Sequence, residues 1–252
     1  MNVEHYLSRI GLKETGLLPT AQTLETLQVA HLRTVPYENL DILAGKPIVL
    51  EKEALYDKIV VRRRGGYCFE LNELFGHLLR ALGYGVVDSF GRFLRGETEI
   101  PMRRHHVLLV TCENGERFVC DVGVGSGSPT RPVPLIEGAE LVDGQDIYHL
   151  CRDDFLGWVL EEAYKGGWRD VYSFTEERQL PVDFVTTSFY CEKSPDSPFN
   201  KAPMVSLRTS EGRRTRDGDE FRIFDASGVH VMTPETSDEI ARLMHEWFDL
   251  ND

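Results

Sequence analysis

The chain has 252 residues, of which 41% are hydrophobic and 27% charged, so it is long enough for one large domain or two to three smaller ones. Its formal net charge of −13 disfavours nucleic acid as a partner, and no apolar run approaches the roughly 18 residues that a membrane span needs. Five cysteines are scattered without a CxxC pair or metal-ligand spacing, and the N-terminus lacks the apolar segment of a signal peptide. We therefore expect a cytoplasmic protein with free thiols, no metal and no membrane or nucleic-acid partner.

The first third of the chain shows helical periodicity. Helices are expected over residues 2–13, 22–34 and 51–60, and a fourth begins near Cys68. In the fourth, one face of a 3.6-residue period carries apolar residues at positions 71, 74, 75, 78, 79 and 82. Gly83 stands where a glycine commonly ends a helix. These patterns predict a helical bundle over residues 1–84.

Cys68 is the first candidate functional residue, because it falls in the first turn of the fourth helix. The free N–H groups and the dipole at a helix start favour an anion, which lowers a thiol pKa and makes a nucleophile. Gly65 and Gly66 precede it and would let a substrate approach closely. The competing interpretation is a small buried hydrophobic residue, which describes most lone cysteines.

From Val86 the apolar period changes to two, which indicates strands. Strands are expected over 86–94, from His105 to Glu113 and from Glu116 to Val122, with further short strands to about residue 185. This pattern predicts a small antiparallel barrel over residues 85–185. Residues 186–252 combine two strands with an amphipathic C-terminal helix, which completes a mixed α+β chain.

The Asn114-Gly115 turn allows the register of one hairpin to be argued. If these two residues form the turn, the numbers of paired residues sum to 229, and Asp121 faces Leu108. His106 then shares a sheet face with Asp121, while His105 points to the other face. The carboxylate could hold the imidazole in one tautomer beside a cysteine nucleophile. A bulge would exchange the two histidines, because a one-residue slip turns every side chain over.

Three further features would support such a site. Glu38 lies between apolar residues, and we expect it to form a buried ion pair with Arg64 behind Cys68, although a surface glutamate is the alternative. Asn72 lies one helical turn beyond Cys68 on the same face and is expected to support the catalytic group. The GVGSG segment at 123–127 follows a strand, but no helix follows it, so a dinucleotide fold is disfavoured and close approach to an anionic ligand is favoured.

Several segments together resemble the arylamine N-acetyltransferase family. They are RRGGYCFELN at 63–72, VPYENLDIL at 35–43, DVGVGSGS at 121–128, and the later PVDF and SPDSPF segments. The resemblance implies a triad of Cys68, His106 and Asp121, and acetyl-CoA as the donor in a ping-pong route through an S-acetyl cysteine. It also implies a helical bundle, a β-barrel and an α/β lid (186–252) around a cysteine-protease-like core, and xenobiotic arylamines or arylhydrazines as acceptors.

The resemblance also suggests where substrates bind. Tyr67, Phe93 and Val124 are expected in the acceptor pocket, and relatives usually carry an aromatic residue or serine at the position of Val124. Coenzyme A is expected to contact four residues, Met102, Arg103, Gly125 and Ser126. Relatives usually have a small residue or threonine immediately before the catalytic histidine, where this chain has His105. We expect a monomer or a homodimer.

Other functions fit the same residues. Amide synthases that close macrolactams resemble these acetyltransferases, but they take a long acyl chain from a carrier protein. A cysteine protease or transglutaminase-like enzyme shares the Cys–His–Asp order. A non-enzymatic ligand-binding protein or thiol sensor would need only Cys68 with a low pKa. Acylation of Cys68 by acetyl-CoA alone would separate an acetyltransferase from these other possibilities.

Overall fold

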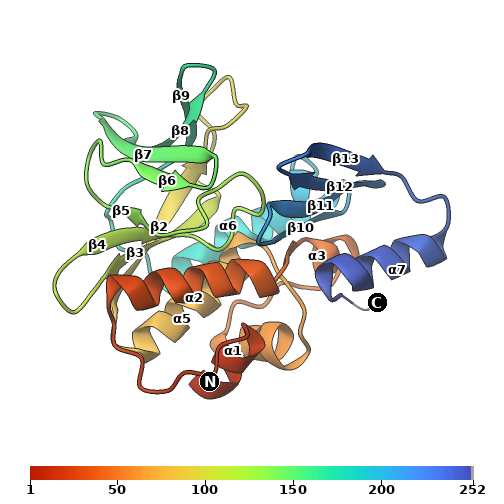
Figure 1. The fold of residues 1–252 in the computed structure, drawn as a ribbon, viewed down its shortest axis with the longest axis horizontal. Helices are drawn as coiled ribbons and strands as arrows, with labels where there is room; N and C mark the ends of the chain where they lie inside the picture. Colours follow the sequence, from red (N-terminus) through yellow and green to blue (C-terminus); the bar gives the residue numbers. More distant parts are fainter. Residues whose placement is uncertain (251–252) are drawn as a thin grey trace.

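The computed structural model describes residues 1–250 and places a set of helices below two antiparallel sheets in the view of Figure 1. This confirms the predicted mixed α+β class. Residues 251–252, which end the expected lid, lie outside the described part. The helices of the first third are α1 (Val3–Arg9), α2 (Ala21–Thr34), α3 (Leu40–Leu43), α4 (Lys52–Tyr56) and α5 (Cys68–Ala81).

Two of the expected helices end earlier than predicted. α1 ends at Arg9, and Gly11 follows with φ of +79°, a left-handed conformation that ends a helix. α4 ends at Tyr56, and residues Asp57–Val61 continue as a π-helical turn. The first third is therefore less regularly helical than its periodicity indicates.

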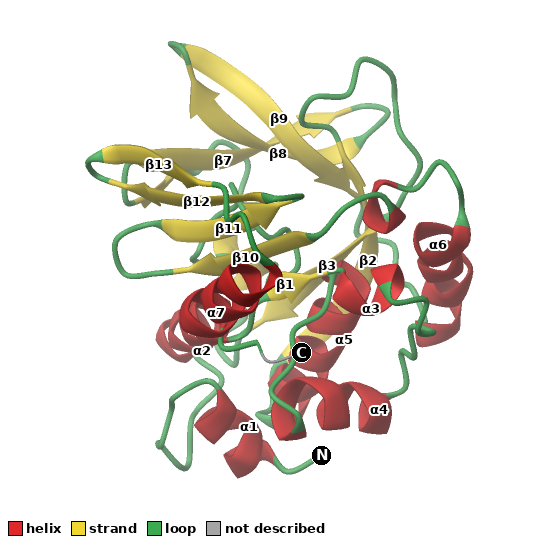
Figure 2. Cartoon of the chain, turned by 90° about the vertical axis from the view of Figure 1, so that its right-hand side faces the viewer, coloured by secondary structure: helices red, strands yellow, loops and turns green. Residues whose placement is uncertain are grey.

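Helix α5 is the centre of the molecule. Its predicted apolar face is buried, with Leu71, Leu74 and Phe75 fully inaccessible, and it packs between the other helices and the barrel. Polar residues on its remaining faces are buried as well, among them Glu70 and Asn72. The helix therefore lies inside the protein, between other helices and strands β2 and β3 of the larger sheet (Figure 2).

The larger sheet is a nearly closed barrel. Its strands are β2 (Gly85–Phe93), β3 (His105–Thr111), β4 (Arg117–Cys120), β5 (Val133–Pro134), β6 (Leu141–Asp143), β7 (Asp146–Asp153), β8 (Gly157–Tyr164) and β9 (Gly167–Phe174). They are ordered β5-β4-β3-β2-β9-β8-β7-β6, and a bridge between Glu137 and Leu150 brings the two ends together. All strand pairs are antiparallel, as the alternating pattern predicted.

The β3–β4 hairpin differs by one residue from the predicted register. Leu108 pairs with Cys120, so the numbers of paired residues sum to 228. The loop has three residues, because the Cys112 N–H donates to the Glu116 carbonyl and Gly115 takes a φ of +86°. A type I turn followed by a left-handed glycine is the common three-residue hairpin loop. Every side chain of one strand is consequently turned over relative to the expectation.

The smaller sheet joins the two ends of the chain. Its strands are β1 (Tyr37–Glu38), β10 (Met204–Arg208), β11 (Arg213–Asp217), β12 (Glu220–Asp225) and β13 (Gly228–Met232), in that order. Helix α7 (Ser237–Phe248) covers one face, with Phe248 packed on Val205 and Phe221. β1 comes from the first third of the chain, so residues far apart in sequence share this sheet.

Helix α6 (Pro181–Lys193) links the two sheets, and a 3₁₀ turn at Pro198–Asn200 follows it. The expected boundary at residues 185 and 186 falls inside α6. Its Phe184 packs against Phe69 of α5 and Phe90 of β2, so α6 covers the start of α5. Within residues 1–250, no helix is both long and apolar enough to cross a membrane.

Candidate active site

Cys68 is the first residue of α5, as its sequence position predicted, and only 2% of its surface is exposed. The Glu70 carboxylate closes the start of the helix by accepting the Tyr67 N–H at 3.2 Å. A Cβ at Gly65 would overlap the Pro36 carbonyl oxygen, and one at Gly66 would come within 2.9 Å of Glu70. The two glycines therefore permit close packing of the protein on itself, and the expectation that they admit substrate was wrong.

Behind this turn lies a buried network of charged side chains. Arg64 Nη2 lies 3.1 Å from Glu38 Oε1, the pair expected from the sequence, and 3.2 Å from Asp41. Lys58 Nζ bridges Asp41 and Glu70, at 2.8 Å from each. Burial alone would raise the pKa of Asp41, but its pairs with Lys58 and Arg64 outweigh burial and lower that pKa to about 2. The network fixes the segment that leads into Cys68.

The histidine that meets Asp121 is His105. Its Nε2 lies 2.6 Å from Asp121 Oδ2, and both side chains are about 95% buried. His106 instead pairs with Asp88, with Nε2 3.1 Å from Asp88 Oδ1. The expected pairing of His106 with Asp121 was wrong, because the three-residue hairpin loop turns residue 106 to the helical side of the sheet. His105 lies on the barrel side, next to Tyr172.

Asn72 holds the Asp121 loop on α5. Its Nδ2 donates to Asp121 Oδ1 at 2.9 Å and to the His106 carbonyl at 2.7 Å, and its Oδ1 accepts the Val122 N–H. Asp121 Oδ1 also accepts the Gly123 N–H at 2.8 Å. One Asp121 oxygen therefore receives two fixed donors, which leaves the other aimed at His105.

The surroundings of the Cys68 sulfur oppose a free thiolate. Burial raises the pKa of this thiol well above its usual range, and the nearby Cys191 and Asp121 add to the effect. Main-chain N–H groups of His106 and Phe69 act in the opposite direction. The expected lowering by the helix start is therefore outweighed by desolvation, which the sequence pattern does not reveal.

Cys68 and His105 line one cavity of about 170 Å³. The other lining residues are Tyr37, Phe93, Arg104, Gly123, Val124, Pro198 and Phe199. A second cavity of about 240 Å³ shares Tyr37 and Val124 with the first and is lined further by Gly125, Ser126 and residues of β10, β11 and β12. The second cavity therefore adjoins the first and lies against strands of the smaller sheet.

Of the remaining residues predicted to contact substrates, four line the two cavities and three do not. Tyr67 is fully buried and lies with its hydroxyl 2.6 Å from Ser188 Oγ, outside the lining of the cavity at Cys68. Met102 is exposed, and Arg103 lies 3.7 Å from Glu177; neither lines this cavity or its neighbour. Phe93, Val124, Gly125 and Ser126 do line these cavities.

Comparison with known proteins gives one consistent result. Residues 20–251 match the N-acetyltransferase family. The arylamine N-acetyltransferase of Mycobacterium tuberculosis H37Rv is 34% identical over all of this chain and 90% of its own length, and that of Escherichia coli K12 is 34% identical over 83% and 74%. The chain belongs to the arylamine N-acetyltransferase family. The solved structure of the Mycobacterium marinum family member in complex with CoA matches with a TM-score of 0.92 at 31% identity, covering 99% of this chain and 93% of the other.

Membership of the arylamine N-acetyltransferase family removes support from the alternative functions. The matched relatives are named as acetyltransferases, and neither bears the name of an amide synthase, a protease or a thiol sensor. Sequence reasoning missed Tyr37, Arg104 and Phe199, which line the cavity at Cys68. Tyr37 lies within the VPYENLDIL segment and Phe199 within SPDSPF, so the family-like segments carried a signal for both. For Arg104, the only signal in the sequence was its position immediately before the two histidines.

Proposed function

We propose that this chain transfers an acetyl group from acetyl-CoA to an arylamine or arylhydrazine, with Cys68, His105 and Asp121 as the catalytic triad. The observation that carries the proposal is the cavity lined by both Cys68 and His105, with Asp121 2.6 Å behind the His105 ring. A nucleophile, a base and a group that orients the base are the parts that acyl transfer through a covalent intermediate requires.

The transfer follows from these roles. His105 takes the thiol proton of Cys68, and Asp121 stabilises the imidazolium that forms. The sulfur attacks the thioester carbonyl, the bond to the CoA sulfur breaks, and His105 returns the proton to the departing thiolate. The amine nitrogen then attacks the S-acetyl group, His105 removes its proton, and the Cys68 thiolate leaves. Because burial raises the pKa of Cys68, its thiolate persists only with the imidazolium beside it.

The second cavity is the proposed route of the CoA chain. Gly125 has a φ of +81°, and a Cβ added there would lie 3.1 Å from the Tyr37 ring, so this loop approaches the junction of the two cavities closely. Gly125 and Ser126 line the second cavity only, whereas Val124 lines both cavities. The CoA complex of the Mycobacterium marinum relative supports this donor. We assign Val124 and Phe93 to the acceptor side. The predicted contacts of Met102 and Arg103 with CoA are not supported, because neither residue lines either cavity.

The decisive experiment is the intact mass of the protein after mixing with acetyl-CoA. One acetyl adduct mapped to Cys68 is expected in the wild type and in the absence of any amine. Cys68→Ala and His105→Asn should show none, whereas the adduct should disappear from the wild type when an arylamine is added. An adduct that persists in His105→Asn at the wild-type rate would overturn the assignment of the base.

The setting of this activity is part of the same proposal. We infer a cytoplasmic enzyme, either a monomer or a homodimer, that acts on xenobiotic arylamines. Cell fractionation followed by an acetylation assay of each fraction tests the location. Light scattering of the purified protein at two concentrations tests the oligomeric state.

A further inference from the structure

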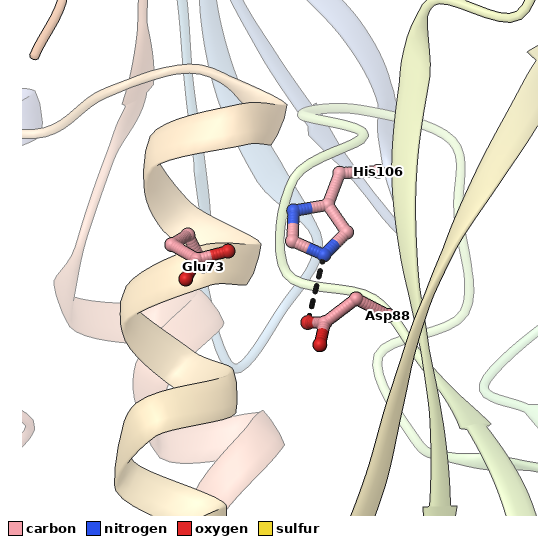
Figure 3. Close-up of side chains that lie close together, drawn as sticks. All are labelled: Glu73, Asp88 and His106. Atoms are coloured by element: carbon pink, nitrogen blue, oxygen red, sulfur yellow. Dashed lines mark hydrogen bonds and ion pairs between the residues drawn. The ribbon is translucent and has the colours of Figure 1, made fainter. Parts of the chain in front are cut away.

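His106 has a second, separate environment on the helical side of β3. Its side chain is fully buried, and Figure 3 shows it between α5 and β2, facing Asp88 and Glu73. One nitrogen of its ring lies 3.1 Å from Asp88 Oδ1, and ligand atoms of His106, Asp88 and Glu73 all lie within 4.8 Å of one another. Within residues 1–250, the other ring nitrogen of His106 has no hydrogen-bond partner.

The two carboxylates of this cluster already have protein partners. The guanidinium of Arg80 forms an ion pair with Asp88 Oδ2, and His77 Nε2 lies 3.2 Å from Glu73. Burial would raise the pKa of Asp88, but His106 and Arg80 lower it, so Asp88 remains an ionised acceptor. Both Asp88 oxygens are thus engaged, which disfavours a metal ion at these three residues despite their spacing.

The ring of His106 is fixed from a third direction. Phe184 of α6 stacks on it, with ring centroids 4.2 Å apart and an interplanar angle of 26°. The bond to Asp88 and the stacking on Phe184 restrict the rotamers of the His106 side chain. Pairing of β3 with β2 at Phe90 restricts the main chain of the same residue.

The main chain of residue 106 contacts both ends of the proposed catalytic machinery. Its N–H faces the Cys68 thiol and acts to lower the pKa of that thiol, against the larger effect of burial. Its carbonyl accepts Asn72 Nδ2 at 2.7 Å, and the same Asn72 amide donates to Asp121. A small displacement of residue 106 would therefore reach the nucleophile directly and the orienting aspartate through Asn72.

We propose that His106, held by Asp88 and Phe184, is a positioning residue that keeps its own carbonyl on Asn72 and, with it, its main-chain N–H directed toward Cys68. The inference rests on the proposed function in that Cys68 is the nucleophile. It assigns a task to the second histidine of the pair, which lines neither of the two cavities at Cys68. The pair of adjacent histidines then has two roles, with His105 as the base and His106 as its support.

The test is the pH dependence of Cys68 alkylation by iodoacetamide, measured by mass spectrometry on the full chain without acetyl-CoA. His106→Leu removes the bond to Asp88 and should shift the alkylation profile to higher pH by about one unit, since the main-chain N–H of residue 106, which favours the thiolate, is displaced from Cys68. The same variant should lower kcat by roughly 10- to 100-fold while KM for the amine changes by less than about three-fold. His106→Gln restores a donor toward Asp88 and should recover part of both losses. The other titratable or charged groups that face the sulfur are Tyr37, Tyr67, Cys191, Asp121, His105 and Arg104, and all are unchanged.

A matched control is available in the barrel. His149 also pairs with a carboxylate, Glu161 at 2.7 Å, and stacks on Trp168 at 3.8 Å, but it lies on β7, away from the Cys68 cavity. His149→Leu should leave the alkylation profile unchanged. If His106→Leu does not fold, Asp88→Asn, which keeps the side-chain shape, should give the same shift in a smaller amount. Alkylation profiles of the folded variants that superimpose on the wild type would overturn the proposal. A failure of the proposed function is distinguishable, because the wild type would then form no acetyl adduct.

Discussion

Gly123 offers a sharp test of how closely the site is packed. A Cβ added there would lie 2.6 Å from the Cys68 Cα, 2.8 Å from Asn72 Nδ2 and 3.0 Å from the Cys68 Cβ. The first distance is about 0.8 Å short of the 3.4 Å at which ordinary contact begins. The backbone of Gly123 has no left-handed φ, so alanine is acceptable to the chain conformation itself. The effect of Gly123→Ala is therefore expected to come from the clash of the added Cβ with Cys68 and Asn72, which supply its three nearest atoms.

The size of the effect follows from that displacement. Forcing an extra carbon into a well-packed interior costs about 1–3 kcal/mol of unfolding free energy. A misplacement near 1 Å between reacting groups costs roughly 100-fold in rate. We therefore expect Gly123→Ala to remain folded at 25 °C, with kcat lowered about 100-fold. Moving Asn72 also loosens its bond to Asp121, which acts in the same direction.

The assay is release of the free CoA thiol from acetyl-CoA in the presence of an arylamine, beside urea unfolding of each variant. Gly167→Ala is the matched control, because no atom lies within 4 Å of its added Cβ and its φ is ordinary. This control should keep wild-type kcat. A folded Gly123→Ala variant with kcat within about three-fold of the wild type would refute the claimed packing of Gly123 on the nucleophile.

Three further predictions concern other parts of the molecule. Burial, and to a lesser extent Arg9, lowers the pKa of His31 to about 3 in the folded protein. Below about pH 6.5 this histidine therefore binds a proton in the unfolded chain and stays neutral in the folded one. Stability should fall with pH below that point by up to ~1.4 kcal/mol per unit, and urea unfolding of His31→Phe between pH 7 and 4 should show a flatter dependence. Lys58→Met leaves Asp41 and Glu70 buried without their shared cation, and should lower the unfolding free energy by about 3–5 kcal/mol in urea melts, an effect that Lys52→Met, at an exposed pair, should lack. Val124→Phe narrows both cavities, and should raise KM for a two-ring arylamine at least about ten-fold more than for a one-ring arylamine; equal changes would argue against Val124 as an acceptor contact.

The start of α5 could be predicted from the sequence because its determinants are local. The 3.6-residue spacing from Leu71, the glycines before Cys68 and Gly83 after the helix lie within one segment. The burial of Cys68 could not be predicted in the same way. It depends on α6, whose Phe184 and Cys191 lie more than 100 residues further along the chain and pack over the helix start. The direction of the Cys68 pKa shift could therefore not be predicted from the residues that neighbour Cys68 in the sequence.

The hairpin register failed for a different reason. An Asn-Gly pair suits a two-residue turn, in which both residues take positive φ. It equally suits a three-residue loop that ends on a left-handed glycine, and the structure has Gly115 at +86° while Asn114 is not in the positive-φ region. The two loops differ by one residue in pairing, and nothing in the sequence of the loop alone decides between them. Only the cross-strand partners of β3 fix the choice.

The two histidines show that a histidine–aspartate pair predicted from the sequence does not by itself identify the catalytic base. Residues 107 and 109 of β3 face the barrel core, and residues 108 and 110 face the helices, so His105 and His106 point to opposite sides. Each meets a carboxylate on its own side, Asp121 for His105 and Asp88 for His106. A histidine–aspartate pair is consequently available in either register, and the pair alone does not identify the base. The cavity at Cys68 favours His105 as the proposed base, because His105 lines that cavity and His106 does not.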